Sequence, residues 1–473
     1  MNIPLQDPIF KKLLTIVESK QQEAFIIGGF VRDAILGRPS KDIDVVVVGD
    51  GIAFAEAFSA SLNGKSDLVV FKNFGTAMVK TQDWEIEFVG ARKESYSKES
   101  RKPAVIPGSI KDDQLRRDFT INALAISLNA SNLFELVDPF DGVLDLERKI
   151  IRTPLEPEIT FSDDPLRMMR AIRFASQLNF DIHPQTFEAI KLHADRIHIV
   201  SMERVSDELN KIMLSPKPSI GLNLLFESGL LKLIFPELHA MHGVEVINKK
   251  AHKDNFYHTL QVIDNVCKET NNLWLRWATL LHDIGKPVTK RFMIEEGGWT
   301  FHGHEDRGSK MVARIFRKLK LPLNEKLKYV EKLVALHHRP KVLAEEGITD
   351  SAIRRLIVDA GDDLEDLFTL CRADMTSKFP EKIKLYRSNL GKVQELVKEL
   401  EERDALRNWQ PPVSGEDIMK YFDLRPCREV GLIKAELREA ILDGDVPNSY
   451  EDAFKKMVEI GSRIINEKQF PKA

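Results

Sequence analysis

The chain has 473 residues, which is enough for several domains of ordinary size. Hydrophobic residues make up 43% of it and charged residues 30%, a balance typical of a protein that buries several cores. The net charge of −3 excludes binding of a nucleic acid through overall charge alone, so such a partner requires a local basic patch. Three scattered cysteines indicate a reducing compartment and exclude a zinc ribbon. Because neither a signal peptide nor a membrane-spanning run is evident, we expect a cytoplasmic protein with no membrane partner.

A glycine turn between two apolar segments begins the most informative region. Residues 25–27 predict a short buried strand, Gly28 and Gly29 a turn, residues 31–36 a helix, and residues 43–48 a second buried strand. Glycines in such a turn allow close backbone approach and leave N–H groups that can hold phosphate.

Two acids stand at the start of the second strand. Asp42 and Asp44 are two residues apart, so their side chains share one face of the strand. Adjacent carboxylates repel each other unless cations lie between them, and paired divalent ions are the usual solution. A capped turn with a surface pair of aspartates is the simpler alternative, but beside this glycine turn the pair favours a metal and nucleotide site.

These residues also carry a resemblance. The stretch from Gly28-Gly29 through Val31-Arg32-Asp33 and Gly37 to Asp42-x-Asp44 resembles the first motif of the class II tRNA nucleotidyltransferases and bacterial poly(A) polymerases, in the DNA polymerase β-like superfamily. The resemblance implies that Asp42 and Asp44 hold two Mg²⁺ ions. It also implies that Gly28, Gly29 and Arg32 bind nucleotide phosphates.

The next segments continue the predicted sheet. Residues 68–71 predict a strand, and residues 76–81 and 84–91 alternate like a hairpin. Glu87 on the returning strand matches the acidic strand of the family, which implies a third catalytic carboxylate, although pairing across the strands with Lys80 is equally plausible. Residues 92–114 are polar and contain breakers, so they predict a long mobile loop. In the family, a flexible loop here favours full CCA addition over CC addition.

A second motif follows the predicted loop. Residues 115–124 resemble it nearly letter for letter, which implies that Arg116 and Arg117 bind the triphosphate, Asp118 orients them and Asn122 reaches the sugar. A capped helix with solvated basic residues is the plain alternative. Residues 138–142 resemble the third motif, which links head to neck.

Residues 161–175 contain a predicted helix start, with Asp164 as the cap and Pro165 in the first turn, and Asp164 shares a face with Arg167. Capping and solvation alone can explain both residues. Cytosine and adenine, however, both present an amine donor beside a ring-nitrogen acceptor, which an acid and an arginine can match while rejecting uracil and guanine. The family motif is Glu-Asp-x-x-Arg, with Asp163 here in place of the Glu, and it implies this role for Asp164 and Arg167, with Arg170 also at the nucleotide. Residues 202–209 resemble the last motif, which braces the neck.

A second site is predicted downstream, in apolar and helix-like segments. Single buried histidines are usually core residues, but seven metal-type side chains occur here: His258, His282, Asp283, His304, His337, His338 and Asp374. Imidazoles and carboxylates suit a divalent transition metal of unspecified identity, and adjacent His and Asp can bridge two ions. The set resembles the two-metal variety of the HD-type phosphohydrolases, which implies phosphoester hydrolysis. His302 fits that pattern less well than His304.

The expected fold class is α+β, with a polymerase β-like head and mixed sheet followed by helical domains. We expect a nucleotidyltransferase head (1–150), an all-α neck that binds RNA and nucleobase (151–245), an HD-type domain (246–380) and a helical tail that can contact tRNA (381–473). The expected function is template-independent addition of CCA to tRNA from CTP and ATP. A poly(A) polymerase and a phosphohydrolase with an RNA-binding head are the alternatives, and the oligomeric state is left open.

Overall fold

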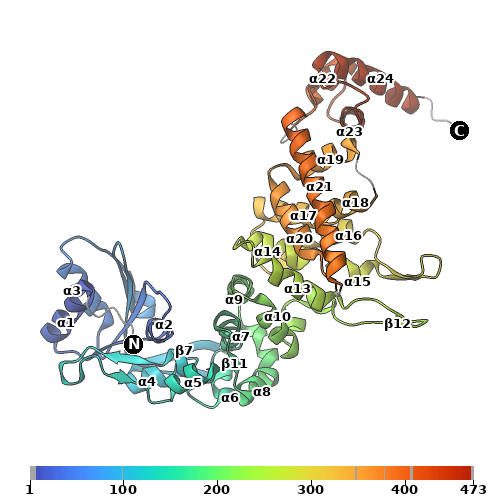
Figure 1. Ribbon diagram of the computed structural model, residues 1–473. Coiled ribbons are helices and arrows are strands. Elements are labelled where there is room, and N and C mark those ends of the chain that lie inside the picture. Colours follow the sequence, from blue (N-terminus) through green and yellow to red (C-terminus); the bar gives the residue numbers. More distant parts are fainter. Residues whose placement is uncertain (1–6, 98–99, 347–348, 378, 405–408, 470–473) are drawn as a thin grey trace. The chain divides into compact units, whose positions relative to one another are not determined.

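The computed structural model describes residues 7–97, 100–346, 349–377, 379–404 and 409–469 (Figure 1). It forms two compact units. The first contains the chain up to His239 together with Lys318–Leu321, and the second contains Ala240–Arg317 and the chain from Pro322 onward. No helix in these described ranges is long and apolar enough to cross a membrane.

A seven-stranded sheet forms the core of the head, in the spatial order β3-β4-β5-β2-β1-β8-β9. The strands are β1 (Ala24–Ile27), β2 (Asp42–Val47), β3 (Asp67–Phe71), β4 (Thr76–Lys80), β5 (Glu85–Gly90), β8 (Ala125–Ser127) and β9 (Leu136–Val137). Strands β2 and β5 are parallel and the other neighbouring pairs are antiparallel. The predicted mixed sheet and the predicted β4–β5 hairpin are therefore confirmed.

Helices shield the sheet from water. Helix α1 (Pro8–Lys20) packs on α3 (Gly51–Ser61), and α3 packs on β3, β4 and β5. The rings of Phe54 and Phe58 lie 5.6 and 5.3 Å from that of Phe88 on β5, an aromatic cluster that anchors the helix. Because β1 and the apolar part of β2 are buried on both faces, they read as continuous apolar runs in the sequence.

The predicted loop over residues 92–114 is wrong in most of its length. Strands β6 (Arg92–Ser97) and β7 (Ser100–Pro107) form a separate antiparallel hairpin, and helix α4 (Ile110–Leu115) follows. Residues 92–114 are polar and contain Pro103 and Pro107-Gly108, so the sequence resembles that of a loop even though backbone pairing forms a hairpin within it.

The neck is helical. Helix α2 (Gly29–Ile35) packs on β1 and β2 in the head, and α5 (Gly142–Arg148) also precedes the neck. The neck helices are α6 (Pro157–Asp163), α7 (Leu166–Leu178), α8 (Pro184–His193), α9 (Met202–Met213), α10 (Pro218–Glu227), α11 (Leu230–Ile234) and α12 (Pro236–His239), and a short parallel pair joins β10 (Ile150–Ile151) to β11 (Asp181–Ile182). The predicted helix start at Asp164-Pro165 is confirmed, because α6 ends at Asp163 and α7 begins at Leu166, directly after Pro165. The predicted capping is present: the Leu166 backbone N–H donates to Asp164 Oδ1 at 3.1 Å.

The second unit is almost entirely helical. Its helices are α13 (Asn255–Val266), α14 (Leu273–Leu281), α15 (Lys286–Thr289), α16 (His304–Lys318), α17 (Glu325–Leu336), α18 (Arg339–Glu346), α19 (Asp350–Ala360), α20 (Leu364–Asp374), α21 (Pro380–Asp404), α22 (Gly415–Phe422), α23 (Arg428–Asp443) and α24 (Tyr450–Gln469). Two small hairpins, β12 (Val246–Ile247) with β13 (Lys250–Ala251) and β14 (Arg291–Met293) with β15 (Gly298–Thr300), complete it.

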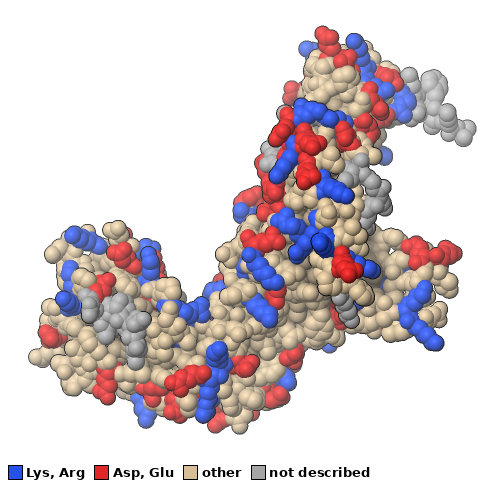
Figure 2. All heavy atoms as spheres, in the orientation of Figure 1, with Lys and Arg blue, Asp and Glu red and all other residues tan. Residues whose placement is uncertain are grey.

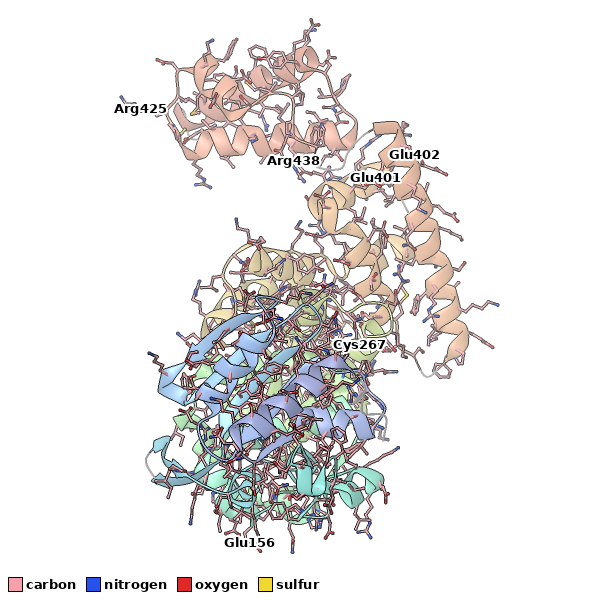
Figure 3. The ribbon with its side chains drawn as sticks, turned by 90° about the vertical axis from the view of Figure 1, so that its left-hand side faces the viewer. Glu156, Cys267, Glu401, Glu402, Arg425 and Arg438 are labelled. Atoms are coloured by element: carbon pink, nitrogen blue, oxygen red, sulfur yellow. The ribbon has the colours of Figure 1, made fainter. Side chains whose placement is uncertain are left out.

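The end of the chain is more than a solvated helical tail. Helices α22, α23 and α24 enclose a core of their own, which includes Val413, Ile433 and Met457 (Figure 3). Outside such cores the surface is charged, and on the face shown in Figure 2 the coloured basic and acidic side chains are interspersed. That mixture agrees with the small net charge of the whole chain.

A chain of hydrogen bonds ties the head to helix α7. The Arg32 guanidinium donates to Asp33 at 2.9 Å and to Asn122 Oδ1 at 2.7 Å. The Asn122 amide donates to Asp118 at 3.0 Å, and Arg170 Nε donates to the other Asp118 oxygen at 2.7 Å. Burial opposes ionisation of Asp118, but the charge of Arg170 and the bond from Asn122 outweigh it and lower the pKa of Asp118 to about 2.

We expect Asp118→Asn to lower the free energy of unfolding by about 2 kcal/mol at neutral pH, since each pKa unit corresponds to about 1.4 kcal/mol. The folded-state pKa is depressed from 3.8 to about 2, so this stabilisation is present above pH 3.8 and is lost as the pH falls toward 2. Urea unfolding of both proteins between pH 2.5 and 7 measures it. The exposed Asp181→Asn serves as the control. A deficit of undiminished size at pH 2.5 would contradict the assignment.

Candidate active site and metal centre

Acidic side chains meet where β2 and β5 lie side by side. The parallel register places Asp44 beside Glu87 and Asp42 beside Glu85. Strand alternation puts all four on one face of the sheet. Lys80 forms an ion pair with Glu85, so the suggested pairing of Lys80 with Glu87 is not the one observed. Glu87 is instead placed next to the two aspartates.

This arrangement is electrostatically costly. Burial raises the pKa of Asp44, and the nearby charges of Glu87 and Asp42 raise it further, while Arg117 acts in the opposite direction. A cation at this face would offset the repulsion. Carboxylate oxygens are also the ligands that Mg²⁺ prefers, so the residues present fit a magnesium site.

The glycine turn brings the backbone against these charges. Gly28 has φ +83°, and an added Cβ would lie 3.0 Å from both Asp44 Oδ2 and Arg117 Nη1. Its N–H donates to the Leu124 carbonyl, which fixes the turn against the second motif. Glycine is required here because a side chain would collide with both charged groups.

The arginines of the second motif are held by an acid that sequence reasoning missed. Asp113 on α4 is fully buried, and its two oxygens accept from Arg116 at 3.0 Å and Arg117 at 3.2 Å. Asp113 therefore orients both arginines, while Asp118 binds Asn122 and Arg170. The spacings of three and four residues along the helix were the available signal.

Several predicted residues surround one cavity of about 250 Å³. It is lined by Arg116, Arg117, Asp118, Asp164, Arg167, Arg170 and Arg204. The Arg167 guanidinium donates to the Arg116 carbonyl at 2.6 Å, which fixes its position. Arg204 on α9 was expected only to brace the neck. It lies far along the chain from the other lining residues, so the sequence did not predict its position at this cavity.

Two predicted phosphate-binding residues are placed differently. Arg32 is buried, its guanidinium is engaged by Asp33 and Asn122, and it lies 5.0 Å from the Phe174 ring. Phosphate binding by Arg32 stays a prediction. Gly29 is the first residue of α2, and a Cβ added to it would lie 3.7 Å from Arg32 Nη2.

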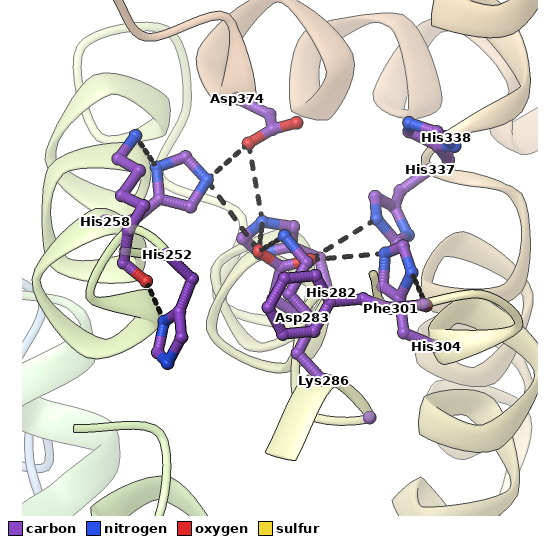
Figure 4. Close-up of polar contacts among 12 residues, drawn as sticks. His252, His258, His282, Asp283, Lys286, Phe301, His304, His337, His338 and Asp374 are labelled. Carbon is purple, nitrogen blue, oxygen red and sulfur yellow. Dashed lines mark hydrogen bonds and ion pairs between the residues drawn. The ribbon is translucent and has the colours of Figure 1, made fainter. Parts of the chain in front are cut away.

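The histidines of the second unit converge on Asp283 (Figure 4). Asp283 Oδ2 lies 3.3 Å from His282 Nε2 and 3.8 Å from His258 Nε2. Asp283 Oδ1 lies 3.4 Å from His304 Nε2 and 3.8 Å from His337 Nε2. The two oxygens of one carboxylate thus face two separate histidine pairs, which is the arrangement of a bridging ligand.

The imidazoles are oriented for ligation. His282 Nδ1–H donates to the Thr279 carbonyl at 2.7 Å and His304 Nδ1–H to that of Phe301 at 3.0 Å. His337 is held in the same way by a carbonyl one turn earlier. These bonds leave the Nε2 lone pairs directed toward Asp283. His282 Nε2 is buried and has no hydrogen-bond partner among the described residues, so this donor set fits divalent transition metals.

Lys253 and Lys286 also reach this centre and were missed by sequence reasoning. Lys286 Nζ lies 2.6 Å from Asp283 Oδ2, and Lys253 Nζ lies 2.7 Å from His258 Nδ1. Burial opposes ionisation of Asp283, yet His282 and Lys286 hold its pKa well below the usual range. The carboxylate is therefore ionised and able to bind a cation.

The remaining predicted ligands lie at the edge of the centre. Asp374 Oδ1 is 2.7 Å from His258 Nε2 and 3.5 Å from His282 Nε2. His338 bonds to Glu305 at 3.1 Å and is 37% exposed, at the rim of the cluster. His302 is 74% exposed and pairs with Glu296, in agreement with its lower rank.

Three family models match successive parts of the chain. Residues 24–152 match the family model of the Poly A polymerase head domain, residues 179–241 that of the probable RNA and SrmB- binding site of polymerase A, and residues 255–367 that of the HD domain.

Two relatives align over nearly the whole chain. The A-adding tRNA nucleotidyltransferase of Deinococcus radiodurans is 32% identical over 90% of this chain and 93% of its own. The CC-adding tRNA nucleotidyltransferase of Thermus thermophilus is 30% identical over 91% and 92%.

A solved structure shares the fold. The Bacillus stearothermophilus CCA-adding enzyme in complex with CTP has a TM-score of 0.63 and is 23% identical. The match covers 99% of this chain and 100% of that enzyme's chain. The two relatives confirm the expected family, and the shared fold confirms the expected fold class. The chain belongs to the tRNA nucleotidyltransferase and poly(A) polymerase family and is a nucleotidyltransferase.

Proposed function

We propose that the chain adds C, C and A to the 3′ end of tRNA without a nucleic-acid template, using CTP and ATP. The observation that carries the proposal is the placement of Asp42, Asp44 and Glu87 on one sheet face, beside the Gly28 turn and Arg117. Relatives named for A addition and for CC addition are about equally similar, so activity itself must decide how many of the three steps the chain performs.

In this proposal Asp42 and Asp44, with Glu87, hold two Mg²⁺ ions. When bound, the ions lower the pKa of the primer hydroxyl and neutralise the triphosphate. Arg116 and Arg117, oriented by Asp113, bind triphosphate oxygens through planar guanidinium groups.

Base selection is proposed for the cavity that Asp164 and Arg167 line. An acceptor on Asp164 matches the exocyclic amine of cytosine or adenine, and a donor on Arg167 matches the adjacent ring nitrogen. Uracil and guanine place a carbonyl and an N–H there, so both contacts become repulsive in a site shielded from water. The protein side chains thereby replace a template.

The direct test is incubation of the full chain and Mg²⁺ with tRNA transcripts ending before CCA, after C, or after CC. Each transcript is offered CTP, ATP or both. The proposal expects two C additions with CTP alone and completion to CCA with both. Addition of A only to the CC-ending transcript, of C only, or of a long A tail would replace the proposal by A-adding, CC-adding or poly(A) activity. Absence of any incorporation would contradict nucleotidyl transfer.

Replacement of the base-selecting acid should change specificity. Asp164→Ala removes one charged hydrogen bond to the base, so we expect kcat/KM for CTP and ATP to fall by about 10- to 100-fold while that for UTP is unchanged. Glu158→Ala, which alters an exposed acid on the preceding helix α6, is the matched control. Equal losses for CTP, ATP and UTP would assign Asp164 to structure alone.

The glycine turn offers a second paired test. Gly28→Ala and Gly37→Ala both place a side chain at positive φ, +83° and +69°, but only the first Cβ meets Asp44 and Arg117, whereas nothing lies within 4 Å of the second. We therefore expect Gly28→Ala to weaken Mg²⁺–CTP binding at least tenfold and Gly37→Ala to leave it nearly unchanged. Isothermal titration calorimetry measures both. Similar affinities in the two variants would show that nucleotide does not approach this turn.

A second activity is supported at the histidine centre. We propose metal-dependent hydrolysis of a phosphoester there, because Asp283 presents its two oxygens to two oriented histidine pairs. His258, His282, His304 and His337, with Asp374, would hold two divalent transition metal ions. Such ions supply a water-derived nucleophile at neutral pH and polarise the phosphate.

Removal of the bridging carboxylate should remove the metal without affecting the head. We expect Asp283→Ala to retain less than a tenth of the wild-type Mn²⁺ per chain after desalting, as measured by elemental analysis, and to keep full nucleotidyl transfer. Asp306→Ala, an exposed acid two residues after His304, is the control. Unchanged Mn²⁺ content in Asp283→Ala would rule out this centre as the main metal site.

A further inference from the structure

Two cavities meet at the histidine centre. The smaller one, of about 180 Å³, contains the metal-type ligands, and the larger one, of about 700 Å³, extends away from them. His338 lines both, and Glu305, which bonds to His338, lines the larger one. The two spaces therefore adjoin at the exposed rim of the centre.

The small cavity is suited to an anion. Lys253, Lys286 and Lys341 line it together with the histidines and acids. A phosphate at this place would be surrounded by positive charge in addition to any bound metal. The cavity is too small for a larger organic group beside the phosphate.

The large cavity has a different chemical character. Val342, Leu343 and Leu356, from helices α18 and α19, give it an apolar wall. Its volume lies in the range of about 300–1,000 Å³ that accommodates drug-sized organic ligands. Such a wall stabilises an apolar group by removing it from water.

The charged groups of the large cavity are already paired. Arg339 and Arg438 both bind Asp359, and Arg355 Nε donates to Glu439 at 2.7 Å. Because these charges are largely neutralised by their partners, the large cavity has little attraction for a second anionic group of the ligand. The planar guanidinium faces can still stack on an aromatic ring. Arg438 and Glu439 belong to α23, so the C-terminal helices supply one wall (Figure 3).

We infer that the large cavity binds the organic part of a phosphate ester whose phosphate lies at the histidine centre. The ligand class is a phosphomonoester or phosphonate with an apolar, preferably aromatic group. This inference rests on the proposed phosphohydrolase function. It also gives the C-terminal helices a part in the selection of that substrate.

The test uses two phosphonates that cannot be hydrolysed, methylphosphonate and 1-naphthylphosphonate, titrated calorimetrically into the full Mn²⁺-loaded chain. We expect the naphthyl compound to bind at least tenfold more tightly. Val342→Trp, which fills the cavity, should abolish that preference and leave methylphosphonate affinity unchanged. Ala344→Trp, on the same helix but not lining the cavity, should preserve both. Ala352→Trp, from the wall on α19, repeats the test if the first variant does not fold.

The outcomes separate the two proposals. Equal binding of the two phosphonates by the wild type, or an unchanged preference in Val342→Trp and Ala352→Trp, would overturn the inference while leaving the metal centre intact. Absence of methylphosphonate binding by the Mn²⁺-loaded wild type would overturn both the inference and the proposed hydrolysis.

Discussion

Repulsion between neighbouring carboxylates is the constraint on which the head depends. Parallel pairing of β2 with β5 fixes Asp44 beside Glu87, with Asp42 one pleat away on the same face. Nothing in the strands themselves favours this, since like charges side by side destabilise a sheet. Arg117 offsets part of this repulsion, and a cation bound at the face would offset more of it. The sheet therefore fixes the carboxylates in position, and a bound cation would supply the positive charge that balances them.

Ion pairs between acids and arginines fix further charged side chains in place around this face. Asp113 orients Arg116 and Arg117, and Asp118 holds Arg170 on α7, so these guanidinium groups are fixed in place before the proposed binding of a nucleotide. Binding then costs little side-chain entropy. In the histidine centre, backbone carbonyls hold the imidazoles of His282, His304 and His337 by their Nδ1 atoms.

Most of the correct predictions came from local sequence patterns. The β1 and β2 strands, the Gly28 turn and the shared face of Asp42 and Asp44 followed from periodicity, and the family from ordered motifs. Two kinds of feature escaped. The β6–β7 ribbon was expected as a loop because residues 92–114 are polar and contain breakers, and no local pattern revealed the pairing of its strands. Contacts between residues far apart in sequence also escaped. Arg204, for example, lines the same cavity as Arg116 and Arg167 because of how the helices pack, which periodicity does not specify.

The central claim is that the Asp42, Asp44 and Glu87 face is unfavourable until Mg²⁺ and nucleotide occupy it. Thermal unfolding of the wild type and Asp44→Asn, each in EDTA and in Mg²⁺–CTP, tests it most directly. The account predicts that Asp44→Asn unfolds at a higher temperature than the wild type in EDTA and gains almost nothing from Mg²⁺–CTP, while the wild type gains clearly. A variant that is less stable in EDTA and is stabilised by Mg²⁺–CTP as much as the wild type would contradict it.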